Sequence, residues 1–568
     1  MRQQSPMTDQ ALAAPRDYLQ AQIRWHWGEI VFWLATLLPF VLTPSYLVLA
    51  SQIAITALFA LSLDLILGFC GIVSLGHAAY FGVGAYTAGL LSKWGFGEPL
   101  SGLVLAALAA GIFGYLTSFI IARFRHLALI MLTLGLALLL QEIANSASLL
   151  TGGSDGLQGI HTWPIFGRFR FDLYGYTAYG YSLALLFVVF LVARRLIHSP
   201  FGLALRGIRE NATRMPAIGA ATRGHIRTIY TIAAAIAGIA GALLAQTTET
   251  VSLEVSGFQR SADVLVMLRS ILRAQSAILV FLDRAHSHRG GHAAAERHPR
   301  RPFVAHAARE GKTVSEIALS ARGLYNSFGS LVVASDIELT LPAGARYALI
   351  GPNGAGKTTL INLMTGMLRP DAGRIALDGA DITALPPEQR VKRGLVRTFQ
   401  INALFPHLTA LESVTLAVCE RTRAVRTWWR KVSAYRHEID EAYDILAALS
   451  LTAVCHRPTR ELAYGQQRLL EIALAMATRP KVLLLDEPAA GVPREDSAEL
   501  FNAIAGLSRE ITVLFIEHDM ELVFRFASRV IVLVGGRVLV EGTPHEIASD
   551  PQVRAVYLGR AMGKIAHG

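Results

Sequence analysis

The chain has 568 residues, of which 52% are hydrophobic and only 17% charged, an apolar excess that excludes an ordinary soluble protein. Its formal charge is +11, but the basic residues before residue 283 lie between apolar stretches, which argues against nucleic acid as the partner. Three scattered cysteines, Cys70, Cys419 and Cys455, argue against a disulfide framework and for a reducing compartment around the C-terminal half.

The N-terminal half predicts an all-α transmembrane bundle over residues 30–282. The preceding segment, 1–29, is polar and lacks the apolar core and cleavage site of a signal peptide, so we expect the first apolar stretch to be retained as an anchor. The stretches suited to crossing a bilayer lie near 30–43, 46–68, 71–92, 98–122, 127–147, 177–193 and 226–246.

Basic residues cluster in two connections of this bundle, at 123–126 and 194–227. Because positive charge stays on the cytoplasmic side, we expect both connections and residues 1–29 to be cytoplasmic, and residues 148–176 to face outward.

Seven crossings leave the chain outside, so an eighth must return it to the cytoplasm. The only candidate is 261–282, which contains Arg269 and Arg273. Each arginine costs roughly 2.5–3.5 kcal/mol near a helix centre on insertion scales, which makes this stretch a poor span by itself.

Two ionisable residues, Asp64 and His77, fall at apparent membrane depth, where we weigh a structural hydrogen bond against contact with a substrate. Nearby glycines favour close helix packing, with a substrate-lining break in the helix as the alternative. These glycines are Gly68, Gly71, Gly76, Gly82, Gly84 and Gly89.

The segment 199–211 mixes apolar and basic residues at roughly helical spacing and precedes Met215, Ile218 and Gly219. It predicts a short cytoplasmic helix that docks onto a partner domain. The alternative is an interfacial helix whose arginines meet anionic lipid headgroups.

Between residues 283 and 312 the apolar pattern gives way to an Arg- and His-rich run. Histidines can bind metal, but these have no supporting carboxylates and no regular ligand spacing. We therefore expect a solvated, flexible linker between two halves.

Residues Gly351 to Thr358 read GPNGAGKT, a complete phosphate-binding loop. An apolar strand over 345–350 leads into the loop and a helix over 358–364 follows it, which is the context that supports the motif. Backbone N–H groups of such a loop surround phosphate oxygens, Lys357 reaches the terminal phosphates and the Thr358 hydroxyl can ligate Mg²⁺.

About 130 residues later, the apolar run from Val482 ends in Asp486 and Glu487. Asp486 is placed to hold Mg²⁺ through water, and Glu487 to polarise the attacking water as general base. Between the two motifs, Leu462 to Arg468 read LAYGQQR and open a helix whose N-terminal N–H groups suit an anion.

With these motifs the chain resembles the ATP-binding-cassette (ABC) family, which implies an α/β P-loop ATPase domain over 313–568 that binds ATP and Mg²⁺. The resemblance implies that Gln400 lies near Mg²⁺, that His518 contacts the γ-phosphate and that Phe328 stacks on adenine. The implied nucleotide-binding set is Phe328, Gly351, Asn353, Gly354, Gly356, Lys357, Thr358, Thr359, Ala463, Tyr464, Gly465 and Gln466; the metal set is Thr358, Gln400 and Asp486; the catalytic set is Glu487, His518 and Gln400.

Two positions depart from the family pattern. Ala463 stands where the family usually has a serine that contacts the γ-phosphate, and residues 489–492 read AAGV in place of a Ser-x-Leu-Asp turn. The resemblance also implies that the single cassette completes its site only with a second one, because family cassettes hydrolyse ATP as head-to-tail dimers.

Within that family, the nucleotide half looks like the ATPase of branched-chain amino acid importers, and strings in the membrane half resemble the permease of the same system. The strings are SLGHAAYFG from Ser74, TGGSDG from Thr151 and IREN from Ile208. The resemblance implies a transmembrane permease domain over 30–282 fused to its ATPase, multi-pass in the bacterial inner membrane with the ATPase in the cytoplasm. The implied partners are a second permease, a second cassette and an external solute-binding protein.

The implied substrate is a branched-chain amino acid, although related systems carry urea, other amino acids or aromatic acids. The family permease continues past Leu268 into a Gly-rich turn and further apolar helices, whereas this chain departs from that pattern at Arg269. A transport-defective ATP-binding protein with a truncated permease therefore stays open as an alternative. An exporter is a further one, although exporters lack the strings from Thr151 and Ile208.

Overall fold

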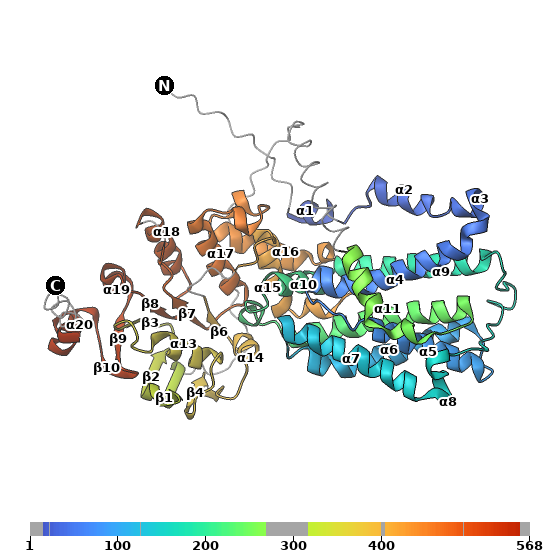
Figure 1. Cartoon of the computed structure of the whole chain (residues 1–568). Coiled ribbons are helices and arrows are strands. Elements are labelled where there is room, and N and C mark those ends of the chain that lie inside the picture. Colours follow the sequence, from blue (N-terminus) through green and yellow to red (C-terminus); the bar gives the residue numbers. More distant parts are fainter. Residues whose placement is uncertain are drawn as a thin grey trace, which may run out of the picture.

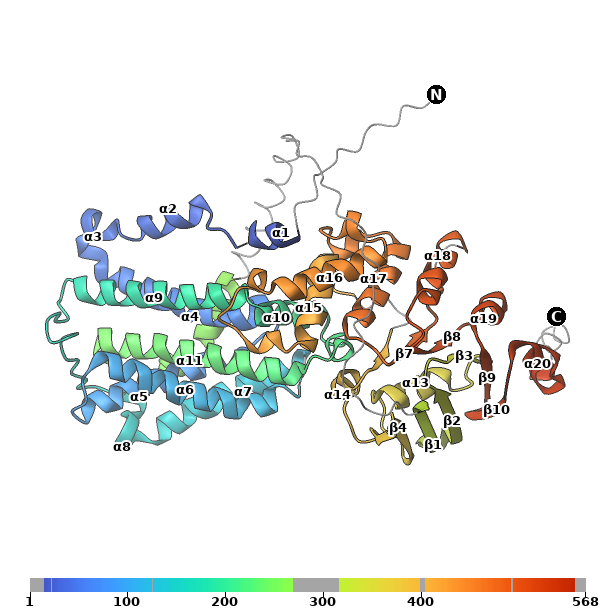
Figure 2. The same ribbon diagram turned by 180° about the vertical axis from the view of Figure 1, so that it is seen from behind.

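The protein is described by a computed structural model with an elongated shape, in which a helical half and an α/β half lie end to end (Figures 1 and 2). The structure describes residues 15–21, 23–124, 126–268, 316–398, 404–491 and 494–556, with the backbone alone over 494–499. The linker predicted over 283–312, and the remainder of the eighth stretch after residue 268, lie outside the described residues.

The helical half consists of long helices packed side by side, with short helices at its ends. Its helices are α1 (Pro15–Ala21), α2 (Trp27–Ala35), α3 (Pro39–Leu42), α4 (Leu47–Cys70), α5 (Ala78–Lys93), α6 (Pro99–Ile121), α7 (His126–Ser146), α8 (Ser148–Thr151), α9 (Tyr176–Ile197), α10 (Pro200–Asn211) and α11 (Thr222–Thr248). Residues 258–268 are also helical.

Among the described residues, five helices are long and apolar enough to cross a membrane: Pro44–Cys70, α6, α7, α9 and α11. The expectation of seven such helices was wrong for two stretches. The first stretch bends between α2 and α3, where Pro39 begins a new helix. Even taken together, Trp27–Leu42 is apolar but shorter than the five spans. The third starts with non-helical backbone over 71–77, so that α5 has only 16 residues, about 24 Å of helix.

The path of the chain nevertheless agrees with the expected alternation of sides. Helices α3 and α8 lie at the end of the bundle away from the α/β half, whereas α1 and α10 lie beside that half (Figure 1). The connection expected to face outward is tied to the far end of α11 by backbone hydrogen bonds between Leu157 and Val251. The two Arg-containing connections lie at the opposite end.

Glycines allow the central helices α5, α6 and α11 to pack with their backbones almost in contact. A Cβ atom on Gly84 of α5 would lie 2.1 Å from the Gly238 carbonyl oxygen of α11, and one on Gly241 would lie 1.9 Å from the Phe81 carbonyl oxygen. Gly71, at φ 73°, ends α4 in the left-handed conformation that favours glycine. Close packing, the first of the two expected roles for these glycines, is thus confirmed at Gly84.

The α/β half contains two sheets. A four-stranded antiparallel sheet has the order β2-β1-β4-β5, and a six-stranded sheet has the order β10-β9-β3-β8-β7-β6, in which only β10 is antiparallel. The strands are β1 (Ile317–Phe328), β2 (Leu331–Pro342), β3 (Arg346–Ile350), β4 (Ala372–Leu377), β5 (Ala380–Asp381), β6 (Leu395–Arg397), β7 (Val482–Asp486), β8 (Thr512–Ile516), β9 (Arg529–Val534) and β10 (Arg537–Gly542).

Strands β7 and β8 are buried at every position, as expected of central strands in a parallel sheet covered by helices. Helices α15, α16 and α17 form a separate helical layer on the side facing the membrane half (Figure 2). The helices of this half are α13 (Lys357–Thr365), α14 (Pro387–Lys392), α15 (Ala410–Arg421), α16 (Arg436–Ala448), α17 (Tyr464–Ala477), α18 (Arg494–Ala505), α19 (Met520–Phe526) and α20 (Pro544–Ser549). The predicted fold class, an all-α membrane bundle followed by an α/β P-loop domain, is confirmed.

The glycine contacts predict a sharp difference between two substitutions in the bundle. Gly84→Val places side-chain atoms against the α11 backbone, which cannot move aside cheaply, and should destabilise the bundle by about 1–3 kcal/mol. Gly135→Val on α7 is the control, because nothing lies within 4 Å of a Cβ at that position. The measurement is the thermal midpoint of each detergent-solubilised variant; equal midpoints would contradict the tight α5–α11 contact.

Candidate functional site

The phosphate-binding loop joins strand β3 to helix α13, as the sequence predicts. Three of its glycines have positive φ angles, 158° at Gly351, 82° at Gly354 and 101° at Gly356. A Cβ on Gly356 would lie 2.7 Å from the Val333 carbonyl oxygen. The loop thus needs glycine both for its conformation and for its close approach to β2, and it leads into the N-terminus of α13, where backbone N–H groups suit an anion.

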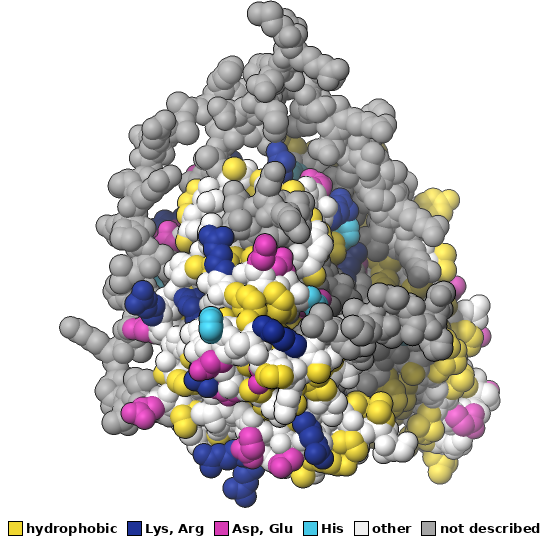
Figure 3. Space-filling model, turned by 90° about the vertical axis from the view of Figure 1, so that its left-hand side faces the viewer, with side chains coloured by type: hydrophobic (Ala, Val, Ile, Leu, Met, Phe, Trp, Pro, Cys, Tyr) yellow, Lys and Arg dark blue, Asp and Glu magenta, His cyan; other side chains and the backbone are white. Residues whose placement is uncertain are grey.

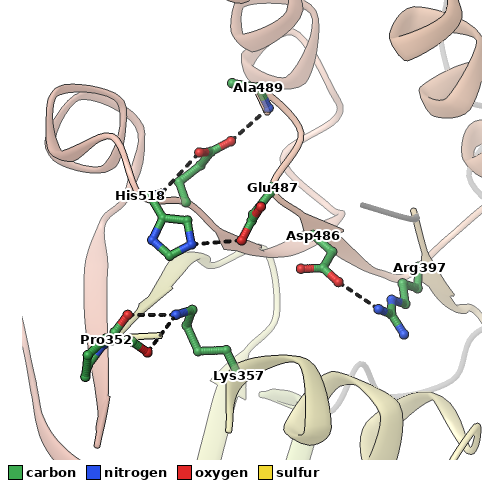
Figure 4. Close-up of polar contacts among 9 residues, drawn as sticks. Pro352, Lys357, Arg397, Asp486, Glu487, Ala489 and His518 are labelled. Atoms are coloured by element: carbon green, nitrogen blue, oxygen red, sulfur yellow. Dashed lines mark hydrogen bonds and ion pairs between the residues drawn. The ribbon is translucent and has the colours of Figure 1, made fainter. Parts of the chain in front are cut away.

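Lys357 begins α13 and folds its side chain back over the loop. Its Nζ atom donates to the carbonyl oxygens of Gly351, at 2.7 Å, and Pro352, at 3.2 Å (Figure 4). Burial lowers the pKa of Lys357, and the nearby charges of Glu487 and Asp486 oppose that shift. The ammonium group therefore lies at the loop and within the field of two carboxylates.

Asp486 ends strand β7 and is only 1% exposed. Its Oδ2 atom accepts from Arg397 Nη2 at 2.7 Å (Figure 4). Arg397 also donates to Asn362 of α13. A buried carboxylate is costly without a partner, and Arg397 supplies that partner for Asp486 beside the phosphate-binding loop. Sequence reasoning missed Arg397, because only the pairing of β6 with β7 brings it to this carboxylate.

Glu487 follows the strand in the left-handed region, at φ 47°, a strained conformation for a residue other than glycine. Its Oε1 atom lies 2.8 Å from His518 Nε2 (Figure 4). The structure thus brings together two residues that the sequence separates by 31 positions, because β7 and β8 are parallel neighbours and both side chains follow the same edge of the sheet.

Glu517, which sequence reasoning did not single out, holds the backbone around Glu487 and His518 through hydrogen bonds. Its two carboxylate oxygens accept from the backbone N–H groups of Ala489, at 2.9 Å, and His518, at 3.3 Å. Burial raises the pKa of Glu517, and these two hydrogen bonds oppose the shift. The side chain ties the turn after β7 to the turn after β8.

The LAYGQQR motif opens helix α17. The Ala463 N–H donates to Gln466 Oε1 at 3.2 Å, so Gln466 caps the first turn that Ala463 cannot cap with its own side chain. The Tyr464 hydroxyl donates to the Ala490 carbonyl oxygen at 2.8 Å, and Gly491 lies against the same hydroxyl. The motif is therefore fastened to the turn that follows Glu487.

The buried pair Arg468–Glu471, at 2.9 Å, extends this connection toward the membrane half. Arg468 Nη2 donates to the Tyr464 hydroxyl at 2.9 Å and to the Ala490 carbonyl oxygen at 3.2 Å. Burial lowers the pKa of Arg214, in the connection between α10 and α11, and the charge of Glu471 opposes that shift. Buried charged side chains thus extend from Arg214, between α10 and α11, to Glu471 and Arg468 on α17.

The other expected site residues lie in different parts of the ATPase half or outside the described residues. Phe328 ends β1 and is 55% exposed, so its ring is available for stacking. Gln400 lies outside the described residues. Asn353, Gly354, Thr358 and Thr359 belong to the loop and to the first turn of α13, and Gly465 lies in the first turn of α17.

The helix expected over 199–211 forms as α10 and docks onto the α/β half. Ser199 caps it, with its hydroxyl accepting from the Gly202 N–H, and Pro200 is its first residue. Its apolar residues are buried, and a Cβ on Gly207 would lie 2.8 Å from Leu416 Cδ2 of α15. Docking onto a partner domain, the first of the two expected roles for this segment, is confirmed.

Polar contacts fix the position of α10 on α15. Arg206 donates to Glu412 at 3.1 Å, and the N–H of His407 donates to Glu210 at 3.0 Å. From the start of α11, His225 Nε2 lies 2.6 Å from Glu420. Since Glu412 and Glu420 are each 3% exposed, one face of α15 is covered by the membrane half.

Of the two ionisable residues in the bundle, His77 is fully buried and its Nε2 atom lies 2.9 Å from the Ser62 hydroxyl. This is the structural hydrogen bond weighed in the sequence. Asp64 lies one turn before Gly68 on α4, and its Oδ1 atom is buried without a hydrogen-bond partner among the described residues.

Comparison with known families agrees with this architecture in both halves. Residues 45–269 match a family model described as the permease component of branched-chain amino acid transport systems. Residues 334–490 match the ABC transporter model, and residues 537–562 match a model described as the branched-chain amino acid ATP-binding cassette transporter. The class of protein is thus a membrane permease fused to an ABC ATPase domain.

Curated relatives match the ATPase half along almost all of their own length. The branched-chain amino acid transport ATP-binding protein BraF of Pseudomonas aeruginosa is 40% identical over 258 residues, 44% of this chain and 100% of the relative. LivG of Escherichia coli K12, described in the same terms, is 39% identical over 255 residues, with the same two shares. LptB of Acidithiobacillus ferridurans, an ATP-binding protein of a lipopolysaccharide export system, is 38% identical over 242 residues, 42% of this chain and 96% of the relative. The chain belongs to the ABC transporter family, in its branched-chain amino acid transport branch.

The contact between α10 and α15 predicts that a branched side chain at Gly207 loosens the docked halves. Gly207→Val should force Leu416 and Met215 aside and weaken docking by about 1–3 kcal/mol. Hydrogen–deuterium exchange of the backbone amides of α15 should then become faster. Gly224→Val, in the first turn of α11, is the matched control, because the only atom within 4 Å of its Cβ lies 3.7 Å away; equal exchange in both variants would contradict the contact.

Proposed function

We propose that this protein is a fused permease and ATPase subunit that drives import of branched-chain amino acids across the bacterial inner membrane, with the ATPase domain in the cytoplasm. The observation that carries the proposal is the docking of α10, from a half that matches a branched-chain amino acid permease, onto α15 of the ATPase half in one chain. Closure of the ATPase domain would move α10 and, through it, the bundle.

The ligands around the phosphate-binding loop support this role. Backbone N–H groups and an ammonium group suit phosphates, and hydroxyl and carboxylate oxygens suit Mg²⁺. ATP with Mg²⁺ supplies the phosphoryl group that is transferred to water. Lys357 and the backbone of the loop would hold the phosphates, and Thr358, Gln400 and the Arg397-paired Asp486 would hold Mg²⁺.

Glu487 would take a proton from the attacking water, and His518, already within hydrogen-bond distance of it, would orient that carboxylate and contact the γ-phosphate. Phe328 would stack on adenine. Apart from Phe328, which ends β1 in the other sheet, these roles use residues from β3–α13, β7 and β8, whose side chains gather at one edge of the six-stranded sheet (Figure 4).

A second cassette would complete the site. The LAYGQQR helix α17 lies in the helical layer, apart from the α13 end of the same domain in both views (Figures 1 and 2). Residues Ala463 to Gln466 would therefore act on the nucleotide of the partner cassette. A second permease would complete the pathway, and an external solute-binding protein would select and deliver the amino acid.

The proposal divides the chain into a cytoplasmic segment, 1–29, a permease domain, 30–282, a linker, 283–312, and the ATPase domain, 313–568. The permease model ends at residue 269, which leaves a second candidate function, an ATP-binding protein that no longer transports. The two candidates differ in whether ATP turnover responds to a loaded binding protein.

Substituting the proposed general base should separate nucleotide binding from hydrolysis. We expect Glu487→Gln to lower ATP turnover roughly 100-fold or more, because the amide cannot accept the proton, while ATP binding is kept. Lys357→Ala should instead weaken ATP binding itself. Glu510→Gln, an exposed glutamate in the turn before β8, is the matched control. Turnover of Glu487→Gln equal to that of the control would remove Glu487 from the chemistry.

Reconstitution tests the import function directly. The full chain is placed in liposomes with candidate partner subunits, and ATP turnover is measured with no binding protein, with the empty binding protein and with the leucine-loaded one. Import predicts stimulation by the loaded form and uptake of labelled leucine. Turnover that ignores the binding protein, without uptake, would favour the non-transporting alternative.

A further inference from the structure

A basic and aromatic stretch joins α15 to α16 and takes no part in the nucleotide site. Residues 421–437 contain six arginines and lysines and no acidic residue, with two adjacent tryptophans in their middle. We call this stretch the basic–aromatic segment. Its basic residues are Arg421, Arg423, Arg426, Arg430, Lys431 and Arg436.

The basic–aromatic segment forms hydrogen bonds with the end of the apolar helix α9. The N–H of Val432 donates to the His198 carbonyl oxygen at 2.8 Å, directly after α9 ends at Ile197. Arg195 Nε, in the last turn of α9, donates to the Trp429 carbonyl oxygen at 2.6 Å. The segment therefore lies at the depth where α9 leaves the membrane.

Neighbouring residues mark this depth as the boundary between hydrocarbon and water. The apolar run of α9 stops at Arg194 and Arg195. The Arg194 guanidinium lies 4.6 Å from the ring centroid of Trp25, and Trp27 begins the apolar helix α2. Tryptophan and arginine concentrate at bilayer interfaces, because their apolar parts face hydrocarbon while their polar groups reach water and headgroups.

Packing leaves both tryptophans and several basic side chains on the outside of the basic–aromatic segment, whereas Arg421 is largely buried and pairs with Glu441. Val425 and Val432 are buried and anchor it, whereas Trp428 and Trp429 are 38% and 56% exposed. Their rings meet edge to face, with centroids 5.8 Å apart. Arg430 is exposed, and its guanidinium lies 5.5 Å from the ring centroid of Tyr435. Two exposed tryptophans among cations are costly in water and well suited to a headgroup layer.

We propose that the basic–aromatic segment binds anionic phospholipid headgroups of the leaflet that faces the ATPase half. The exposed tryptophans would enter the headgroup layer, and the guanidinium and ammonium groups would pair with lipid phosphates. The occupant is a lipid surface, because the segment continues the boundary set by α9 and carries only positive charge.

The outer face of the ATPase half has a different character. The face of the ATPase half that points away from the bundle carries basic and acidic side chains interspersed (Figure 3). The basic–aromatic segment follows α15 directly, and α15 receives α10. Lipid binding would thus hold the C-terminal end of α15 at the membrane, while its covered face contacts the bundle.

Energy transfer to labelled lipid tests the proposal on the full chain in nanodiscs. Ala434 is exposed, and Cys70, Cys419 and Cys455 are buried, so Ala434→Cys provides a single accessible thiol for a donor dye. The acceptor is a trace of headgroup-labelled phosphatidylglycerol in one set of discs and of headgroup-labelled phosphatidylcholine in the other. We expect transfer to phosphatidylglycerol to exceed transfer to phosphatidylcholine at least twofold, and the excess to fall as salt screens the charges.

Charge reversal with a matched control completes the test. Arg430→Glu with Lys431→Glu should remove the excess, and Trp428→Ser with Trp429→Ser should lower transfer to both lipids. Arg322→Glu with Arg374→Glu, an exposed cross-strand pair on β1 and β4, should leave the excess unchanged.

Equal transfer to the two lipids in the unsubstituted segment would overturn the proposal. The proposal would also be overturned if charge reversal left the excess transfer to phosphatidylglycerol unchanged and instead caused loss of a co-purified partner subunit. That result would show that the surface binds protein. Because the readout needs neither ATP hydrolysis nor uptake, a failure here is distinguishable from a failure of the proposed import function.

Discussion

The packing of α10 against α15 is the contact on which the rest of the architecture depends. It places a membrane bundle and an ATPase domain end to end and covers the carboxylates Glu412 and Glu420 with basic groups of the other half. Gly207 sets how closely the helices approach, because any side chain there would meet Leu416. Buried charges are costly unless paired, so these ion pairs favour one register of α10 on α15.

Two further sets of contacts connect this interface to the nucleotide site and stiffen the membrane bundle. Toward the nucleotide site, the buried Arg468–Glu471 pair and the Tyr464 hydroxyl connect the docked helical layer to the turn that follows Glu487. Toward the membrane, the glycines of α5 and α11 let two helices meet backbone to backbone, which limits independent movement of either. Helix α10 is therefore connected through packed groups to both ends of the molecule.

The nucleotide residues lie at the edge of a parallel sheet, where strands distant in sequence end together. Arg397 and Glu517 position the residues of the motifs, because they form hydrogen bonds to Asp486 and to the turns around His518. The position of the ATPase half at the membrane rests on a second contact, between the basic–aromatic segment and the end of α9. The proposed lipid contact would reinforce the same position from outside the protein.

The sequence by itself determined the two halves, the phosphate-binding loop, the strand that ends in Asp486 and the docking helix α10, because each depends on local composition, spacing or periodicity. Only the tertiary structure decided the partners that lie far apart in the chain, such as Arg397 with Asp486 and Glu487 with His518. Strand order brings these side chains together, and no local pattern encodes strand order. The short α5 also came from the structure. Close packing against α11 accommodates the irregular backbone before α5, which an isolated helix in lipid would not tolerate.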